Sequence, residues 1–319
     1  MNKDILKFLK HLFVFLLFLG AVFYCINSIY ISQFVLNNEK ELKDNEILKS
    51  ISNVKYLFLG DSRPATTIRP EFIPGSYNYC FGGENYSQVY YRARRVLRND
   101  RMDYLVLPLD VHSFSDYRSN PYSDIIYWYK FLNVEELSRQ TGKSEALLAI
   151  NKHLPFIGNG RDFRGFSMYN NDGGNKMFVE GWRRLGDASR ANDPNKEFEA
   201  RNRVKEHFKR YPEIMNKELF DFFIKTIELA KDKNIKVILI KYPFSEDYLE
   251  EVAMLGIDVD KFYDDINEKI IKYDHVAILD YQTGFDDEFF YNSDHLNTGG
   301  AEIFSRQLDE DLKNLNLIN

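Results

Sequence analysis

The chain has 319 residues, with 42 Lys and Arg against 48 Asp and Glu, and therefore a formal net charge of −6. Acidic and basic residues are mixed along the chain, and a general nucleic-acid-binding protein would instead show a basic face, so the composition argues against that class. The length allows one large domain or two small ones with a sizeable core.

An uncharged apolar segment lies near the N-terminus. No Asp, Glu, Lys or Arg occurs from Leu12 to Asn38, and residues 12–31 are almost wholly apolar. A helix needs roughly 20 such residues to cross a bilayer. A cleaved signal peptide is the main alternative, but no small-x-small cleavage site stands near the end of the run. We expect residues 1–38 to form a cytoplasmic tip and an uncleaved transmembrane anchor.

The charges on either side of this segment indicate its orientation. Lys3, Lys7 and Lys10 precede it and are opposed only by Asp4, whereas acidic and basic residues are mixed after it. The positive-inside rule then places the N-terminus in the cytoplasm. We therefore expect a single-pass protein of the cytoplasmic membrane, with residues 39–319 forming an extracytoplasmic domain.

The rest of the chain alternates between strand and helix signals. Short apolar runs bounded by turn residues predict five strands, at residues 54–60, 76–81, 102–110, 235–243 and 275–281. Helical spacing predicts helices at residues 85–99, 220–234, 246–256, 261–274 and 298–315. Strands separated by helices indicate an α/β fold with a five-stranded parallel sheet that is covered on both faces.

Residues 111–215 interrupt this alternation between the third and fourth strands. The segment is rich in Tyr, Phe, Gly, Asn and Arg. A long irregular segment in a compact domain is usually functional or disordered, and the aromatic content argues against disorder. We interpret it as an insertion over one edge of the sheet that forms a lid or a substrate groove.

Candidate site residues follow the ends of the predicted strands. Ser62 follows the first strand, Gly82 the second, Asp110 and His112 the third, and the sequence YNSDHLNTGG (291–300) the fifth. Ligands of open parallel sheets bind beyond the carboxyl ends of the strands, so a hydroxyl, a glycine turn and a histidine are expected at one edge. Acyl transfer uses these parts: a nucleophile, a base beside it and N–H groups that stabilise an oxyanion.

Each of these features also has a purely structural interpretation. Gly-Asp-Ser after a strand is a common turn with a helix cap, because Asp and Ser are good capping residues. Gly82 and Gly83 can form a tight turn, and His295 can cap a helix. The order of the features along the chain favours the catalytic interpretation, since GDS follows the first strand and His295 stands just before the last helix.

Three segments resemble the SGNH (GDSL-type) hydrolase superfamily. FLGDSRP (58–64) is similar to the block that carries the nucleophile, YNYCFGGENY (77–86) to the block whose glycine joins the oxyanion hole, and DHLNTGGAEIFS (294–305) to the block that carries the histidine. The chain most resembles the membrane-anchored branch, with its alginate O-acetyltransferase-type and D-alanyl-lipoteichoic acid biosynthesis proteins. The resemblance covers residues 54–110 and 235–315 and implies a flavodoxin-like three-layer sandwich.

The resemblance implies a role for each matched residue. Ser62 is the expected nucleophile and His295 the general base, with the N–H groups of Ser62 and Gly82 holding the oxyanion. The family's acid stands three residues before the histidine, where this chain has Asn292, and its aspartate is instead the neighbouring Asp294. Adjacent side chains of an extended segment point to opposite faces, so Asn292 or a backbone carbonyl is an alternative partner for the ring.

A second departure from the family concerns the oxyanion hole. The family's asparagine donor after the third strand is absent, and the sequence there is LPLDVHSF with Asp110. Asn85 or a group from the insertion is a candidate substitute for this donor. Arg63 and Arg69 lie near the proposed nucleophile and are candidate contacts for an anionic substrate. Four histidines, His112, His153, His207 and His275, have no ligand-like spacing with acidic residues or cysteines, so we expect neither a metal nor a cofactor.

The leading hypothesis is a membrane-anchored O-acyltransferase, with acetyl as the acyl group, that acts on a cell-surface polysaccharide or cell-envelope polymer. The resemblance implies a multi-span membrane acyltransferase as its partner. One alternative is an esterase or deacetylase of the same fold, which uses water as the acceptor. Another is a non-catalytic assembly or glycan-binding protein on a decayed scaffold.

Overall fold

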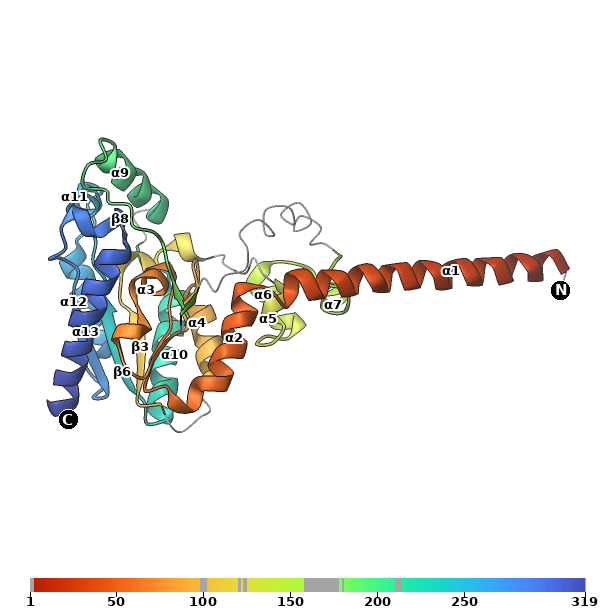
Figure 1. Ribbon diagram of the computed structural model, residues 1–319, viewed down its shortest axis with the longest axis horizontal. Coiled ribbons are helices and arrows are strands. Elements are labelled where there is room, and N and C mark those ends of the chain that lie inside the picture. The colour runs from red at the N-terminus through yellow and green to blue at the C-terminus, as the bar shows by residue number, and fades with distance from the viewer. Residues whose placement is uncertain are drawn as a thin grey trace. The chain divides into compact units, whose positions relative to one another are not determined.

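The computed structural model describes residues 3–97, 102–119, 122, 125–157, 178–179, 181–209 and 214–318. The chain divides into two compact units (Figure 1). One unit comprises Met1–Asp44 and Tyr122–Asn175, and the other comprises Asn45–Pro121 and Lys176–Asn319. The insertion predicted at 111–215 is therefore divided between the units, and a large part of it lies outside the described residues.

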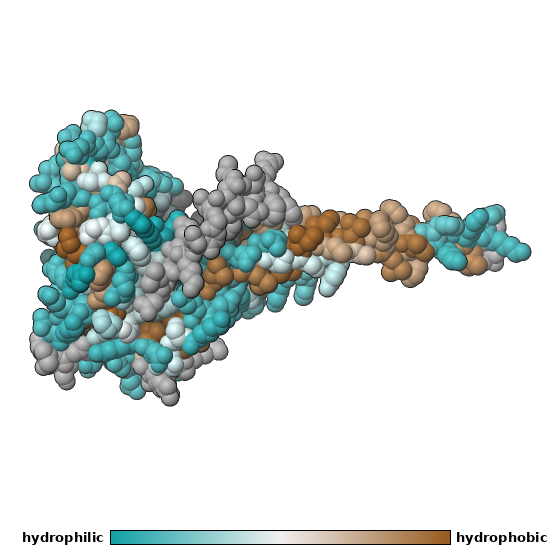
Figure 2. Space-filling view, viewed as in Figure 1, coloured by the Kyte–Doolittle hydropathy of each residue, from teal (hydrophilic) through white to brown (hydrophobic). Residues whose placement is uncertain are grey.

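The first unit begins with a long apolar helix. Helix α1 (Lys3–Tyr30) continues into a π-helical turn, Ile31–Val35, and the two together are long and apolar enough to cross a membrane. Figure 2 shows hydrophobic residues along most of this helix. Length and composition fit a signal sequence equally well, so they establish a candidate span and no orientation.

Short helices accompany the N-terminal segment in the first unit: α5 (Ile125–Trp128), α6 (Val134–Thr141) and α7 (Glu145–His153). The Asn27 side-chain oxygen accepts a hydrogen bond from Phe156 N at 3.3 Å. The Tyr127 hydroxyl donates to Asp44 at 2.9 Å. Residues 125–157 are therefore tied to the N-terminal segment. Helix α2 (Glu39–Ser50) leads from there into the second unit.

The second unit is built on a five-stranded parallel sheet with the order β2-β1-β3-β6-β7. This is the flavodoxin-like order, in which β2 lies on one side of β1 and the later strands are added on the other side. The predicted fold class is confirmed, and each strand is shorter than its predicted range: β1 (Tyr56–Phe58), β2 (Ser76–Asn78), β3 (Tyr104–Pro108), β6 (Lys236–Lys241) and β7 (Val276–Asp280).

Alternate residues of each strand point to opposite faces of this sheet, and both sets are apolar. Each face is therefore covered by helices, which form two core clusters with it. Leu57 and Leu105 belong to one core cluster and Phe58 and Val106 to the other. The first cluster includes residues of α4 (Tyr86–Val96), α10 (Lys217–Asp232), α11 (Glu246–Met254) and α12 (Val259–Ile270). The second includes residues of α3 (Ser62–Thr67) and α13 (Thr298–Ile318), which completes a three-layer sandwich.

Several short elements of the second unit lie outside the predicted alternation. Helix α9 (Lys196–His207) precedes α10. Two small hairpins join β4 (Phe178–Val179) to β5 (Trp182–Arg183), and β8 (Phe290–Asn292) to β9 (His295–Leu296). Short 3₁₀ turns occupy Ile51–Asn53, Pro70–Phe72, Val111–Phe114, Asp116–Arg118 and Asp287–Phe289. The β5 strand and the β8–β9 hairpin both reach the edge of the sheet where α3 begins.

Candidate active site

Ser62 is the first residue of helix α3, directly after the turn that ends β1. Gly60 allows this turn, because a Cβ atom there would lie 2.8 Å from both Pro64 Cγ and Pro108 Cδ. Asp61 is the N-cap, and its carboxylate accepts a hydrogen bond from Arg63 N at 3.1 Å. Since Asp61 supplies the capping oxygen, the hydroxyl of Ser62 is left for another partner.

The buried side chain of Asn78 fixes the other end of α3. Its amide nitrogen donates to the carbonyl oxygens of Pro64 and Ile68, both at 2.8 Å. The same side chain accepts a hydrogen bond from Cys80 N at 3.2 Å. The six-residue helix that carries Ser62 is therefore held to the end of β2. The sequence analysis did not select Asn78, because the segment that contains it (residues 77–86) was interpreted only through its glycines.

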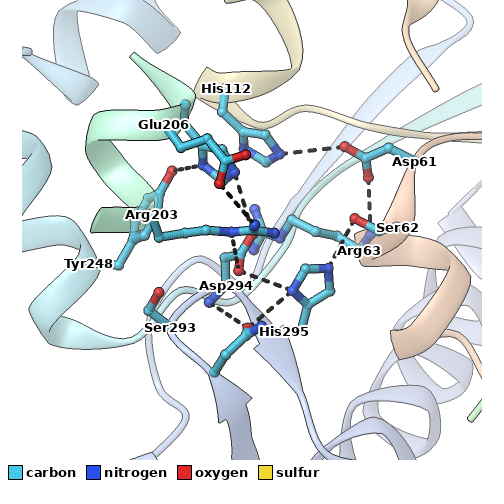
Figure 3. A network of polar contacts seen from close by, with 12 residues as sticks. Asp61, Ser62, Arg63, His112, Arg203, Glu206, Tyr248, Ser293, Asp294 and His295 are labelled. Atoms are coloured by element: carbon cyan, nitrogen blue, oxygen red, sulfur yellow. Dashed lines mark hydrogen bonds and ion pairs between the residues drawn. The ribbon is translucent and has the colours of Figure 1, made fainter. Parts of the chain in front are cut away.

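The hydroxyl of Ser62 lies 2.9 Å from His295 Nε2 (Figure 3). The other ring nitrogen, Nδ1, lies 3.0 Å from Asn292 Oδ1 and 3.0 Å from Asp294 Oδ1. Both of these atoms accept hydrogen bonds, so they favour the tautomer with a proton on Nδ1. In that tautomer Nε2 is free to accept the proton of the Ser62 hydroxyl. Ser62 is partly exposed, whereas His295 is buried.

Both alternative partners of His295 therefore reach its ring. The opposite orientation expected for adjacent side chains does not apply to Asp294, because Ser293 and Asp294 form the turn of the β8–β9 hairpin and are not extended. Asn292 Oδ1 also accepts a hydrogen bond from Asp294 N at 3.2 Å, which ties the turn together.

Asp294 is buried and surrounded by cationic and ring groups. Arg203 donates to both of its carboxylate oxygens, with Nε at 3.0 Å and Nη2 at 3.1 Å. His207 Nε2 lies 3.8 Å away. Burial alone would raise the pKa of Asp294, but His295, His207 and Arg203 outweigh burial and hold that pKa well below its usual value. Asp294 is therefore a carboxylate at neutral pH.

Helix α9 holds the hairpin in place through two side chains. Besides the contact of Arg203 with Asp294, the carboxylate of Glu199 accepts hydrogen bonds from Ser293 N at 3.0 Å and from Ser293 Oγ at 3.1 Å. This helix lies in the segment that the sequence analysis interpreted only as an insertion. The amphipathic signal of α9 is weak, so no periodicity marked it.

A buried network continues from Asp294 to the cap of α3 (Figure 3). The ring of His207 stacks on that of His112, with centroids 4.5 Å apart. His112 Nε2 lies 3.4 Å from the Asp61 carboxylate, which also pairs with Arg118 at 2.7 Å. Burial lowers the pKa of His112 to about 4 and that of His207 well below its usual value, so both rings are neutral at neutral pH.

The hydroxyl of Tyr248 and His207 Nδ1 are 2.7 Å apart, which fixes the second ring of the stack. No group of three His, Cys, Asp or Glu side chains with the geometry of a metal site occurs among the described residues. His207 is therefore held by this hydrogen bond, whereas His112 is placed by the stacking of its ring and by its contact with Asp61.

Arg63 does not occupy the position of a substrate contact. Its side chain is buried, with Nη1 3.0 Å from Asp110 Oδ2, and its guanidinium carbon lies 3.6 Å from the ring centroid of Phe244. Asp110 also accepts a hydrogen bond from Tyr242 N at 3.0 Å. Arg63 and Asp110 thus join the ends of β3 and β6 to α3, and the carboxylate is paired with the guanidinium.

Asn85 and Arg69 are likewise engaged elsewhere. The Asn85 amide nitrogen donates to the carbonyl oxygen of Arg118 at 2.7 Å, and its oxygen caps α4, so this side chain is not available as an oxyanion donor. Arg69 pairs with Glu71 at 2.6 Å and with Glu302 at 3.2 Å. We retain neither residue in the site that we propose below.

Gly82 lies beside Ser62, as the glycine turn after the second strand predicted. A methyl group in place of one Gly82 hydrogen would lie 3.9 Å from Ser62 Cβ. Gly82 is exposed and Ser62 is partly exposed, so solvent reaches both residues. The edge of the sheet therefore brings together Ser62, His295, Asn292, Asp294 and Gly82.

The similarity of this chain to known proteins is low. No family model matches the chain, and no curated protein sequence matches it. The solved structures that resemble it include one titled "a putative platelet activating factor from Streptococcus pneumonia", at 12% identity and a TM-score of 0.41, covering 89% of this chain and 98% of that one. Another is titled "a putative acylhydrolase" from Bacteroides fragilis, at 13% identity and a TM-score of 0.37, covering 82% of this chain and 86% of that one. We infer activity from this chain's own residues.

Proposed function

We propose that this protein is a serine-dependent O-acyltransferase that forms an acyl-enzyme on Ser62. The observation that carries the proposal is the hydrogen bond of 2.9 Å between Ser62 Oγ and His295 Nε2, in a ring whose Nδ1 faces two acceptor oxygens. A nucleophile bonded to a base that a third group orients is the arrangement that activates a hydroxyl.

In the first half-reaction, Ser62 Oγ attacks the carbonyl carbon of an ester while His295 Nε2 takes the hydroxyl proton. The N–H groups of Ser62 and Gly82 stabilise the oxyanion that forms. When the intermediate collapses, the bond to the leaving oxygen breaks and His295 returns the proton to that oxygen. The product alcohol leaves, and the acyl group remains on Ser62.

In the second half-reaction, an acceptor hydroxyl attacks the acyl-enzyme. His295 takes the acceptor proton and then returns it to Ser62 Oγ as the new ester leaves. Asp294 stabilises the transient imidazolium, because a carboxylate beside the ring offsets its charge. Asn292 shares the hydrogen bond of Nδ1–H and helps to fix the ring.

The proposed acceptor is a hydroxyl of a cell-surface polysaccharide or cell-envelope polymer, and the proposed acyl group is acetyl. In this proposal the apolar N-terminal helix is an uncleaved single-pass anchor with its N-terminus in the cytoplasm, since Lys3, Lys7 and Lys10 precede it. The α/β unit then works outside the membrane, beside a multi-span membrane acyltransferase that delivers the acyl group.

An esterase is the second candidate, because the same acyl-enzyme reacts with water. The partly exposed position of Ser62 and the exposed Gly82 favour this candidate, since water has access to the ester. The two candidates differ in product. A transferase gives an acylated sugar in the presence of a glycan acceptor, whereas an esterase gives the free acid.

The experiment uses the full chain, purified in detergent and treated with a neutral fluorophosphonate, followed by intact-mass analysis. We expect a single adduct in the wild-type protein that is absent in Ser62→Ala and in His295→Ala. Ser119→Ala, which removes an exposed serine hydroxyl, is the matched control and should label as the wild type does. Absence of an adduct on folded wild-type protein would overturn the proposal in favour of a non-catalytic glycan-binding or assembly protein.

A further inference from the structure

We propose that helix α7 lies on the extracytoplasmic surface of the membrane that α1 spans, with an exposed apolar stripe among the lipids. The inference goes beyond the catalytic site and rests on the part of the proposed function that makes α1 an uncleaved anchor. It assigns an interaction surface to the first unit. The partner that this surface fits is the layer of a bilayer in which lipid headgroups meet acyl chains.

One side of α7 is apolar and exposed. Leu147, Ile150 and Leu154 are 42%, 48% and 37% exposed. Ile150 and Leu154 follow Leu147 by three and seven residues, so these three side chains form an apolar stripe on one side of the helix. Lys152 follows Ile150 by two residues and lies on the opposite side, where it is exposed. The exposed surface of α7 is thus divided into an apolar side and a charged side.

The apolar stripe is not the side by which α7 packs against the rest of the first unit. Leu148 is fully buried, and its carbonyl oxygen accepts a hydrogen bond from the Tyr129 hydroxyl at 2.6 Å. Asn151 is buried, and its side chain donates to the carbonyl oxygen of Ile157. These contacts hold the helix in place through its other side, so the apolar stripe remains available to a partner.

The segment that follows α7 is joined to the apolar part of α1. Phe156 N donates to Asn27 Oδ1 at 3.3 Å, and the ring centroids of Phe156 and Phe23 are 6.4 Å apart. Phe23 and Asn27 both belong to the uncharged run that begins at Leu12. Figure 1 shows α7 beside α1 and further toward the N-terminus than α5 and α6. Of these three short helices, α7 is therefore the one that lies nearest to the membrane.

The length of α1 places this contact at the depth of the outer leaflet. Lys10 is the last charged residue before the uncharged run. A helix rises about 1.5 Å per residue, so Asn27 lies about 25 Å beyond Lys10, whereas the hydrocarbon core of a bilayer is about 30 Å thick. With Lys10 at the cytoplasmic boundary, Phe156 and the end of α7 reach the outer boundary of the hydrocarbon core. Leu and Ile side chains at that depth meet lipid.

A bilayer suits the apolar stripe better than a protein partner does. Each partner of a standard protein interface buries roughly 800 Å², and three partly exposed side chains provide much less. A bilayer needs no complementary surface, because the hydrophobic effect is non-directional and depends on the apolar area removed from water. Together, α1 and the apolar stripe give the first unit two attachments to the membrane, which fix its rotation about the axis of α1.

The test measures contact between α7 and lipid directly. The full chain carries Cys25→Ser, because Cys25 is exposed and Cys80 is buried, and a nitrobenzoxadiazole dye is attached at Ile150→Cys. One copy is placed in each nanodisc of phosphatidylcholine and phosphatidylglycerol, with or without a lipid that carries a nitroxide near the headgroup end of an acyl chain. An interfacial helix buries its apolar side about 5–10 Å deep, so we expect this nitroxide to quench the dye about twofold.

Lys152→Cys is the matched control on the opposite side of the same helix, and its dye should be quenched much less. Leu147→Cys should behave as Ile150→Cys does. Equal quenching at Ile150 and Lys152, or none at Ile150, would overturn the inference. In a bilayer of lipid alone, a water-exposed dye at Ile150 would indicate that a second copy or another protein covers the apolar stripe.

A dye at Phe18→Cys, in the exposed middle of the apolar helix, reports the insertion of α1 independently, through a nitroxide near the tail end of the acyl chain. Quenching at Phe18 without quenching at Ile150 would overturn the inference and leave the anchor in place. No quenching at Phe18 would overturn the anchor, and the inference with it. Fluorophosphonate labelling of the wild type decides acyl transfer separately, since Ser62 belongs to the second unit.

Discussion

Arg203 donates two hydrogen bonds, at 3.0 and 3.1 Å, to the carboxylate of Asp294, which in turn accepts from the ring of His295. The acid of the proposed catalytic group is therefore shared between a guanidinium on α9 and an imidazole on the β8–β9 hairpin. Burial requires this pairing, because an isolated carboxylate in the interior is costly. The same contact connects a helix of the inserted segment to the catalytic hairpin.

Removal of the Asp294 carboxylate should affect acyl transfer more than removal of the Asn292 amide. Both side chains accept from His295 Nδ1, but only Asp294 carries a charge that stabilises the imidazolium. We expect Asp294→Asn to lower the acylation rate by about 10² to 10⁴, and Asn292→Ala to lower it by no more than about tenfold, since a neutral hydrogen bond contributes about 1 kcal/mol. The rate of fluorophosphonate labelling measures both. An equal loss in the two variants would show that the charge is not the deciding property.

Arg203→Met should destabilise the second unit, because the buried Asp294 carboxylate loses the two hydrogen bonds that it accepts from Arg203. The expected loss is about 2 kcal/mol in the free energy of unfolding, less than for a fully buried pair because Arg203 is partly exposed. Arg201→Met is the matched control on the same helix. Arg201 is more exposed and pairs with Glu251, so its loss should be within about 0.5 kcal/mol.

Denaturant unfolding of the full chain in detergent, followed through near-UV circular dichroism, gives both values. Equal losses in Arg203→Met and Arg201→Met would contradict a structural role for the contact with Asp294.

His112 and His207 are buried as neutral rings, so their contribution to stability should fall on acidification. Burial raises the pKa of Asp110 from 3.8 to about 7, so Asp110 contributes with the opposite sign in the same window, and the histidine contribution is measured as a difference between variants. The pKa of His112 is lowered from 6.5 to about 4 by burial, and that of His207 is lowered as well. Between pH 6.5 and pH 4 the unfolded chain protonates His112 and the folded chain does not, so this contribution to stability is complete above pH 6.5 and is lost as the pH falls. For His112 alone the loss from pH 7 to pH 4.5 is about 2 kcal/mol.

The pKa values of Asp61 and Asp294 are also lowered, but their protonation in the unfolded chain occurs near pH 3.8 and affects stability only below that window. Unfolding free energies at several pH values test this. Relative to the wild type, His112→Gln should make the change in unfolding free energy from pH 7 to pH 4.5 less unfavourable by about 2 kcal/mol, whereas His153→Gln, at an exposed histidine, should leave that change as in the wild type. An unchanged slope in His112→Gln would disprove the assignment.

The sheet was predictable because its signals are local. Each buried strand is a short apolar run that ends at a turn, and the crossover helices carry clear amphipathic spacing, so the order of elements followed from the sequence. Ser62, Gly82 and His295 were predictable for the same reason, since each stands directly after a strand or before the last helix. The contact of Asp294 with His295 was not, because it depends on the turn at Ser293.

The parts that could not be predicted depend on contacts between distant segments. Arg203 and Glu199 reach the β8–β9 hairpin across about 90 positions of the chain. Arg63 was chosen for its nearness to Ser62 in sequence, and Asn85 as a substitute for the family's missing donor. Ion pairing with Asp110 and capping of α4 direct these two side chains away from the site. Sequence distance says little about which way a side chain points once a turn or a cap intervenes.

Gly82→Ala should separate access to the nucleophile from the stability of the fold. The added methyl group would lie 3.6 Å from Arg183 Nη1 and 3.9 Å from Ser62 Cβ, which are ordinary contact distances. The backbone of Gly82 does not have the positive φ that Gly83 has. We therefore expect a change of less than about 0.5 kcal/mol in the free energy of unfolding. The methyl group nevertheless occupies the space that an acyl group needs beside Ser62.

Labelling by a small fluorophosphonate should slow by about tenfold in Gly82→Ala and further as the alkyl group of the probe lengthens, because overfilling a packed space costs about 1–3 kcal/mol. Gly299→Ala is the matched control, since its methyl group would meet only Asn297 at 3.5 Å. It should label as the wild type does. Unchanged labelling of Gly82→Ala with every probe would show that the acyl group approaches Ser62 from another side, which would remove Gly82 from the proposed oxyanion site.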